Sequence, residues 1–149
     1  QIGETTGELP IDVSLLTGDF REVLALPKNS VDFIFTDPPY DEESIPLYGD
    51  LAKLGARVLK PGGRFVNLET SQPDSGLIKF LFHLYVRIFV KIAGRLISGS
   101  KIAYNYLAHT IPRFYTAEKL SDILLKAGFN EVNIYTMFMG ISAVHRAVK

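Results

Sequence analysis

The chain has 149 residues, no cysteine, three histidines, and sixteen basic residues that balance sixteen acidic ones. This length fits one domain, and the lack of cysteine excludes disulfides, a thiolate nucleophile and sulfur-ligated metal sites. The balanced charge gives no whole-chain attraction to nucleic acid, and the polar residues 1–10 lack the apolar run of a signal peptide. We therefore expect a single metal-free domain, residues 1–149, in the cytoplasm.

The first half of the chain predicts strands that alternate with helices. Residues 12–17 favour a short strand, and residues 31–36 (VDFIFT) have the apolar run of a parallel strand covered on both faces. A helix is predicted over residues 47–58, because leucine and valine recur there at spacings of four, three and four. The LKPGG segment at 59–63 then turns the chain into a strand at 64–69.

The second half predicts two helices and a hairpin. Residues 77–97 are apolar almost throughout and carry a stripe of Lys, His or Arg at every fourth position: 79, 83, 87, 91 and 95. Five titratable groups would make a membrane span costly. A further helix is predicted between Thr116 as N-cap and Gly128 as C-terminal stop. Residues 131–138 and 141–148 then form two closing strands, paired antiparallel.

This order of elements predicts an α/β fold, a partial Rossmann-like sandwich with a mostly parallel sheet and a C-terminal antiparallel hairpin. The first βαβ unit is predicted to be missing, because the glycines of GETTG at 3–7 follow no strand. Residues 12–17 would then pair directly with residues 31–36, or an exposed sheet edge would recruit a second copy of the chain. We accordingly expect a homo-oligomer.

Acidic residues follow three of the predicted strands, where ligands bind in open α/β sheets. These residues are Asp19 in a GDF run, Asp37 in a DPPY run, and Glu69. In DPPY, two prolines remove two N–H donors, so that carbonyls and the Asp37 carboxylate can accept hydrogen bonds from an amino group. Tyr40 adds a ring on which a planar base could stack. The alternative is that these acids and prolines only end the strands.

The DPPY run resembles the catalytic motif of amino-group DNA methyltransferases. The resemblance implies that Asp37, Pro38 and Tyr40 hold the amine of a flipped-out base while its nitrogen attacks the methyl group of S-adenosylmethionine. The sequence offers no basic groove to bind phosphates, so we expect no nucleic-acid partner.

Residues 57–149 resemble a different family, the C-methyltransferases of ubiquinone and menaquinone biosynthesis. The resemblance lies in the runs RVLKPGGRFVNLETSQP, GRLISGS, YNYLAHTIPRFYTAEKLSDILLKAGF and GISAVHRAVK. It implies a soluble or membrane-peripheral enzyme that uses S-adenosylmethionine to methylate a ring carbon of a polyprenylated quinol. The run LAHTI departs from the family, because His109 stands where an acid is expected.

Two sets of site residues follow from these resemblances. Asp19 matches the acid that bonds the adenine amino group in such methyltransferases, and carbon methylation also needs a base, for which His109 and Tyr104 are candidates on position alone. The predicted cofactor-binding residues are Gly18, Asp19, Phe20 and Asp37. The glycine-rich loop that normally holds the cofactor is absent from the sequence pattern, so the predicted cofactor site is incomplete.

Three interpretations remain open. The chain is a quinone-type methyltransferase, an amino-group methyltransferase acting on a base, or a noncatalytic chimera joined near residues 57–66, where LKPGG occurs in both families. In the first, the helix at 77–97 could rest on an anionic membrane surface and receive a prenyl tail. Alternatively, that helix packs in the core or in a dimer interface with its charges reaching water.

Overall fold

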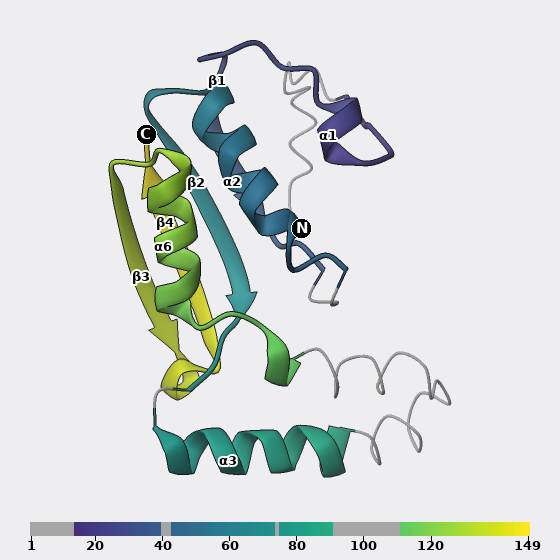
Figure 1. Cartoon of the computed structure of the whole chain (residues 1–149), viewed down its shortest axis with the longest axis vertical. Coiled ribbons are helices and arrows are strands. Elements are labelled where there is room, and N and C mark those ends of the chain that lie inside the picture. Colours follow the sequence, from purple (N-terminus) through teal and green to yellow (C-terminus); the bar gives the residue numbers. More distant parts are fainter. Residues whose placement is uncertain (1–13, 40–42, 74, 91–110) are drawn as a thin grey trace, which may run out of the picture.

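The computed structural model describes residues 14–39, 43–73, 75–90 and 111–149. In these ranges, a four-stranded sheet has the strand order β1-β2-β4-β3, and helices α2 and α6 pack against one face of it (Figure 1). The helices and strands in chain order are α1 (Phe20–Val23), β1 (Val31–Thr36), α2 (Leu47–Val58), β2 (Leu59–Thr70), α3 (Gly76–Tyr85), the π-helical turn η1 (Val86–Val90), the 3-10 turn η2 (Ile111–Arg113), α6 (Ala117–Ala127), β3 (Glu131–Met137), the 3-10 turn η3 (Phe138–Gly140) and β4 (Ser142–Val148).

The sheet is mixed. Strands β1 and β2 run parallel, with Thr36 opposite Asn67, whereas β2–β4 and β3–β4 are antiparallel. The predicted C-terminal hairpin is confirmed, and its second strand, β4, lies in the middle of the sheet. The parallel part of the described sheet is a single pair of strands, which is less than the mostly parallel sheet that the sequence predicted.

The LKPGG segment stays within strand β2 instead of turning the chain away from the sheet. Val31 lies opposite Leu59 and Phe33 lies opposite Arg64, so the register shifts between these two pairs. The extra residues of β2 form a bulge, and Gly62 adopts the positive φ of 79° that this path requires. The bulge lets the proline and glycines remain in an otherwise regular strand.

The core lies between the sheet and the two helices. Helix α2 begins and ends at the predicted residues, and Val58 of its predicted apolar row is buried, but Tyr48 and Ala52 are buried in place of the leucines of that row. Gly55 is buried on the same side of α2, and a larger residue would not fit there, because its Cβ would lie 3.0 Å from the ring of Phe65. A large aromatic ring on the sheet therefore takes the space that a larger helix residue would need.

Two predictions about the first strands are wrong. Residues 14–17 form no strand and are exposed, while residues 12–13 lie outside the described ranges. Strand β1 is covered on one face by α2, but Phe33 and Phe35 on its other face are 55% and 63% exposed. The apolar run of β1 predicted two covering layers, whereas the described helices that pack on the sheet lie on one side of it.

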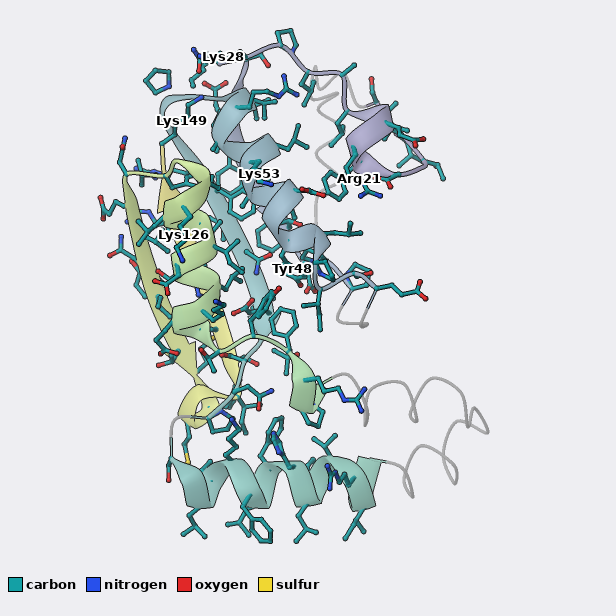
Figure 2. All side chains as sticks on the ribbon, viewed as in Figure 1. Arg21, Lys28, Tyr48, Lys53, Lys126 and Lys149 are labelled. Carbon is teal, nitrogen blue, oxygen red and sulfur yellow. The ribbon has the colours of Figure 1, made fainter. Side chains whose placement is uncertain are left out.

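Helix α3 lies across the end of the sheet, near the C-terminal end of β2 (Figure 1). Side chains on its lower side point away from the sheet (Figure 2). The helix continues into η1 up to Val90, and residues 91–97 of the predicted helix lie outside the described ranges. None of the helices in the described ranges is long and apolar enough to cross a membrane.

Candidate functional site

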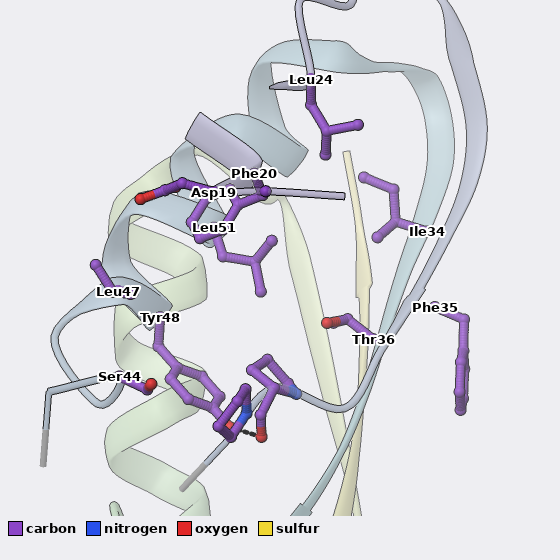
Figure 3. Close-up of a pocket in the computed structure, with 13 residues that line it drawn as sticks. Asp19, Phe20, Leu24, Ile34, Phe35, Thr36, Ser44, Leu47, Tyr48 and Leu51 are labelled. Carbon is purple, nitrogen blue, oxygen red and sulfur yellow. Dashed lines mark hydrogen bonds between the residues drawn. The ribbon is translucent and has the colours of Figure 1, made fainter. Parts of the chain in front are cut away.

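A pocket of about 500 Å³ lies at the C-terminal end of strand β1 (Figure 3). Three segments form its walls: the start of α1, the end of β1 with the prolines that follow, and the first turns of α2. Most of the lining is apolar, including Leu24, Ile34, Leu47 and Leu51. Parallel strands place ligand sites at this end, so the pocket is the candidate site of the molecule.

The predicted cofactor residues Gly18, Asp19 and Phe20 line this pocket together. Gly18 has a φ of +142°, and a Cβ on it would lie 2.8 Å from the Val23 side chain, so the turn requires glycine. Asp19 is the N-cap of α1, where its carboxylate accepts a hydrogen bond from the Arg21 backbone N–H at 2.9 Å. Asp19 therefore begins a helix. The sequence predicted a strand before it, but the described residues 14–17 form none.

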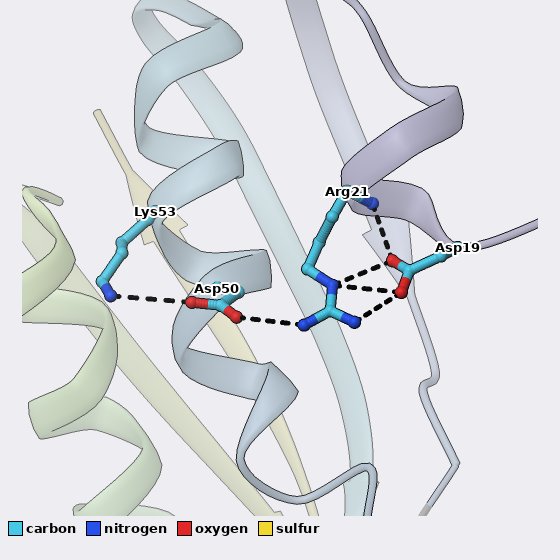
Figure 4. Close-up of polar contacts among 4 residues, drawn as sticks. All are labelled: Asp19, Arg21, Asp50 and Lys53. Atoms are coloured by element: carbon cyan, nitrogen blue, oxygen red, sulfur yellow. Dashed lines mark hydrogen bonds and ion pairs between the residues drawn. The ribbon is translucent and has the colours of Figure 1, made fainter.

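Asp19 forms a close ion pair with the Arg21 side chain (Figure 4). The guanidinium donates to both carboxylate oxygens, from Nε at 3.0 and 3.1 Å and from Nη2 at 2.5 Å. These hydrogen bonds lower the pKa of Asp19 and raise that of Arg21. Arg21 also lies 3.7 Å from Asp50, which lies 3.6 Å from Lys53. The Asp19 carboxylate is thus held ionised and in a fixed orientation at the rim of the pocket.

The DPPY segment contributes its prolines to the pocket lining. The Pro38 carbonyl accepts a hydrogen bond from the Tyr48 hydroxyl at 3.2 Å, which connects this segment to α2 (Figure 3). The sequence predicted that this carbonyl faces an incoming amine, whereas the structure has it bonded within the protein. Asp37 is exposed and does not line the pocket. Tyr40 lies outside the described ranges.

The two candidate bases, Tyr104 and His109, also lie outside the described ranges. The catalytic role of Asp37, Pro38, Tyr40, Tyr104 and His109, and the cofactor-binding role of the residues named above, therefore stay predictions.

A buried polar cluster lies beside the site, on β2, on the residue that follows it and on β4. Asn67, Glu69, Ser71 and His145 are each at most 1% exposed. Asn67 is paired with Thr36 of β1 on one side and with His145 of β4 on the other, so the cluster begins level with the end of β1. Burying polar side chains this completely is costly unless hydrogen bonds compensate for the lost water, which makes this cluster distinctive.

The contacts within the cluster define its protonation. His145 Nε2 lies 2.7 Å from the Ala117 carbonyl oxygen, so Nε2 carries the proton and Nδ1 is left as an acceptor. Glu69 Oε1 lies 3.3 Å from that Nδ1, and Glu69 Oε2 accepts from the Asn67 amide at 3.3 Å. Burial raises the pKa of Glu69 to about 9 and lowers the pKa of His145. At neutral pH, a protonated Glu69 therefore faces a neutral imidazole.

Sequence reasoning noticed Glu69 as a strand-end acid but missed its partner. The alternation of β4 places Ala143, His145 and Ala147 on the buried face. That pattern was visible in the sequence and could have located His145 on the core side. The contact with Glu69 itself depends on the register between β2 and β4, which no local pattern reveals.

The strand order, the helices on the sheet and the pocket beyond a parallel strand define an α/β fold of the Rossmann-like class. The crystal structure of a SAM-dependent methyltransferase from Thermotoga maritima has a similar fold, with a TM-score of 0.56 and 21% sequence identity. The match covers 92% of this chain and 64% of the Thermotoga chain. The sequence profile of the ubiE/COQ5 methyltransferase family matches residues 7–149, and the chain belongs to this family.

Two curated relatives show how much of such a protein the chain represents. The ubiquinone/menaquinone biosynthesis C-methyltransferase UbiE of Pseudomonas putida is 41% identical over 93 residues, which are 62% of this chain and 36% of the relative. The demethylmenaquinone methyltransferase of Staphylococcus haemolyticus is 31% identical over 149 residues, all of this chain and 61% of the relative. The chain thus spans between about a third and three fifths of these relatives.

The family match covers residues 57–66, where the sequence predicted a join, and it includes the DPPY segment. The predicted join and the noncatalytic interpretation both stay predictions.

Proposed function

We propose that the pocket beyond β1 holds the adenine end of S-adenosylmethionine, and that the reaction served is methylation of a ring carbon of a quinol. The observation that carries this proposal is that the Gly18–Phe20 turn meets Pro38 and the start of α2 around one apolar pocket. Nucleotides bind at this end of parallel strands in open α/β sheets.

The lining suits a purine ring. Phe20, Ile34 and Leu51 provide apolar surface against which a flat ring can pack. Asp19 supplies an ionised acceptor for the exocyclic amino group, which would share the carboxylate with Arg21. The cofactor, when bound, supplies an electrophilic methyl group, and these residues bind and orient its adenine.

The predicted incompleteness of the site has a measurable consequence. A chain that contacts the adenine alone should bind adenosine and S-adenosylmethionine with dissociation constants within about threefold of each other, since both ligands present the same group. The measurement is calorimetric titration of each ligand into the protein. Micromolar binding of S-adenosylmethionine together with much weaker binding of adenosine would contradict the incomplete site.

Substitution tests whether binding occurs in this pocket. Phe20→Ala should weaken the binding of both ligands about tenfold, because an aromatic ring stacked on a base contributes about 1–3 kcal/mol. Phe33→Ala is the matched control, since Phe33 lies outside this pocket and is 55% exposed. Equal losses in the two variants, or no adenosine binding at millimolar concentration, would refute the adenine pocket.

The names of two relatives, a ubiquinone/menaquinone biosynthesis C-methyltransferase and a demethylmenaquinone methyltransferase, support the choice of acceptor. We propose a polyprenylated quinol for this chain as well. Transfer of labelled methyl from S-adenosylmethionine to a demethylated naphthoquinol, with the product extracted into organic solvent, tests it. Transfer to a cytosine or adenine amine in DNA would instead support the alternative drawn from DPPY, and no transfer to either acceptor would support a noncatalytic chain.

A further inference from the structure

Helix α3 and the following turn η1 expose an apolar surface. None of the ten residues of α3 is buried. The spacing of Leu77, Leu81, Leu84 and Ile88 is four, three and four, which places them on one side of a helix. The outer face of α3 consists of large apolar side chains that are each 43–69% exposed: Leu77, Phe80, Leu81, Leu84, Tyr85 and Ile88.

The opposite side of this segment faces the protein. Val86 is 2% exposed, and Ile78 and Phe82 on the same side are half-buried. His83 Nε2 lies 2.9 Å from Gln72 Oε1, which connects the helix to the loop after β2. The orientation of the helix is therefore fixed by its contacts, and the outer face of α3 points away from the described protein surface.

The charge of this part of the chain is one-sided. Between Ser75 and Ala117 the sequence has no aspartate or glutamate, although the whole chain has as many acids as bases. The same stretch has six cationic residues: Lys79, Arg87, Lys91, Arg95, Lys101 and Arg113. Arg87 is exposed and flanks the outer face of α3. An apolar face that Arg87 flanks, in a stretch of sequence without acids, is complementary to an anionic lipid surface.

We propose that the outer face of α3 binds the surface of an anionic phospholipid bilayer, with its apolar side chains among the acyl chains and Arg87 at the phosphate groups. This binding does not depend on the methyltransferase reaction. It would bring the protein to the surface in which polyprenylated molecules reside.

Co-sedimentation with vesicles tests the proposal on the whole chain without a methyl donor. We expect binding to vesicles that contain phosphatidylglycerol, and weaker binding to pure phosphatidylcholine or at high salt. Leu84→Glu should lower the partition coefficient at least about tenfold, because it removes an exposed apolar side chain that the bilayer would bury and adds a charge of the wrong sign. Arg87→Gln should lower it about fivefold.

Matched controls lie elsewhere on the molecule. Leu125→Glu on α6 makes the same change at a side chain that is 45% exposed, against 43% for Leu84, and Arg64→Gln on β2 matches Arg87→Gln. Both controls should bind vesicles as the original chain does. Equal binding to neutral and anionic vesicles, equal loss in Leu84→Glu and Leu125→Glu, or a dimer that Leu84→Glu dissociates without any vesicle binding would each overturn the proposal.

Discussion

The carboxyl group of Glu69 keeps its proton at neutral pH because it lies in the core, next to an imidazole that is itself neutral. An unfolded glutamate ionises near pH 4.5, whereas folded Glu69 ionises at about 9. The stabilising contribution of the folded, protonated group is complete below pH 4.5 and falls by about 1.4 kcal/mol per pH unit until it is lost above pH 9.

His145 changes the free energy of unfolding in the opposite direction, and it does so at acidic pH. Its pKa is lowered below the ordinary value of 6.5, so that below pH 6.5 the unfolded chain binds a proton that the folded chain excludes. The contribution of His145 is therefore present above pH 6.5 and is lost as the pH falls. Below pH 6.5 the two slopes have opposite signs, and the Glu69 slope is left alone from pH 6.5 to about 9.

Glu69→Gln should remove the Glu69 slope and leave that of His145. We expect the free energy of unfolding of this variant to be nearly constant between pH 6.5 and 9 and to fall as the pH drops below 6.5, whereas the original chain should lose stability as the pH rises from 6.5 to 9. Urea unfolding followed by circular dichroism at a series of pH values measures this. Glu43→Gln, at an exposed position, should keep the original profile. Parallel profiles for Glu69→Gln and the original chain would show that Glu69 is ionised in the fold.

At the scale of single elements, helix ends were the most predictable features because their signals are local. Thr116 accepts a hydrogen bond from the Lys119 backbone N–H at 3.3 Å, and Gly128 ends α6 with a φ of +113°, both as the sequence predicted. Helix α2 has the predicted bounds, but its buried row is shifted, because Phe65 of β2 decides which small residue fits. Contacts between elements thus override a pattern within one element.

The end of α6 offers a test of this local signal. A Cβ on Gly128 would lie 3.8 Å from the Ala56 Cβ, so Gly128→Ala causes no clash and reports the cost of the left-handed backbone alone. We expect the free energy of unfolding to fall by about 1 kcal/mol. Gly49→Ala within α2 has open space around it and should instead raise that free energy by about 0.5–1 kcal/mol. The free energy of unfolding of both variants is measured with urea. Changes of the same sign in the two variants would contradict the left-handed conformation of Gly128 as the reason for its glycine.

At the scale of the whole molecule, the sequence predicted the α/β class and the closing hairpin, but not which strands lie at the edges. The strand at 12–17 was predicted from its local sequence pattern alone, and its described residues have no neighbouring strand to complete a hydrogen-bond ladder. The position of β4 between β2 and β3 likewise results from pairing over a long sequence separation. The sequence left two outcomes open: residues 12–17 pair with β1, or β1 is an exposed edge. The described residues 14–17 form no strand, which favours the exposed edge.

The open edge at β1 leads us to expect self-association. In the described sheet β1 pairs with β2 alone, and Phe33 beside its open edge is 55% exposed, so a second copy could extend the sheet and cover apolar surface. We expect sedimentation velocity at micromolar concentration to show a dimer or larger species, and Phe33→Lys to raise its dissociation constant at least tenfold, since a lysine blocks edge pairing. Tyr135→Lys on β3, the opposite edge, changes a side chain that is 52% exposed and should leave association intact. A monomer at all concentrations, or an equal rise of the dissociation constant in both lysine variants, would exclude association through β1.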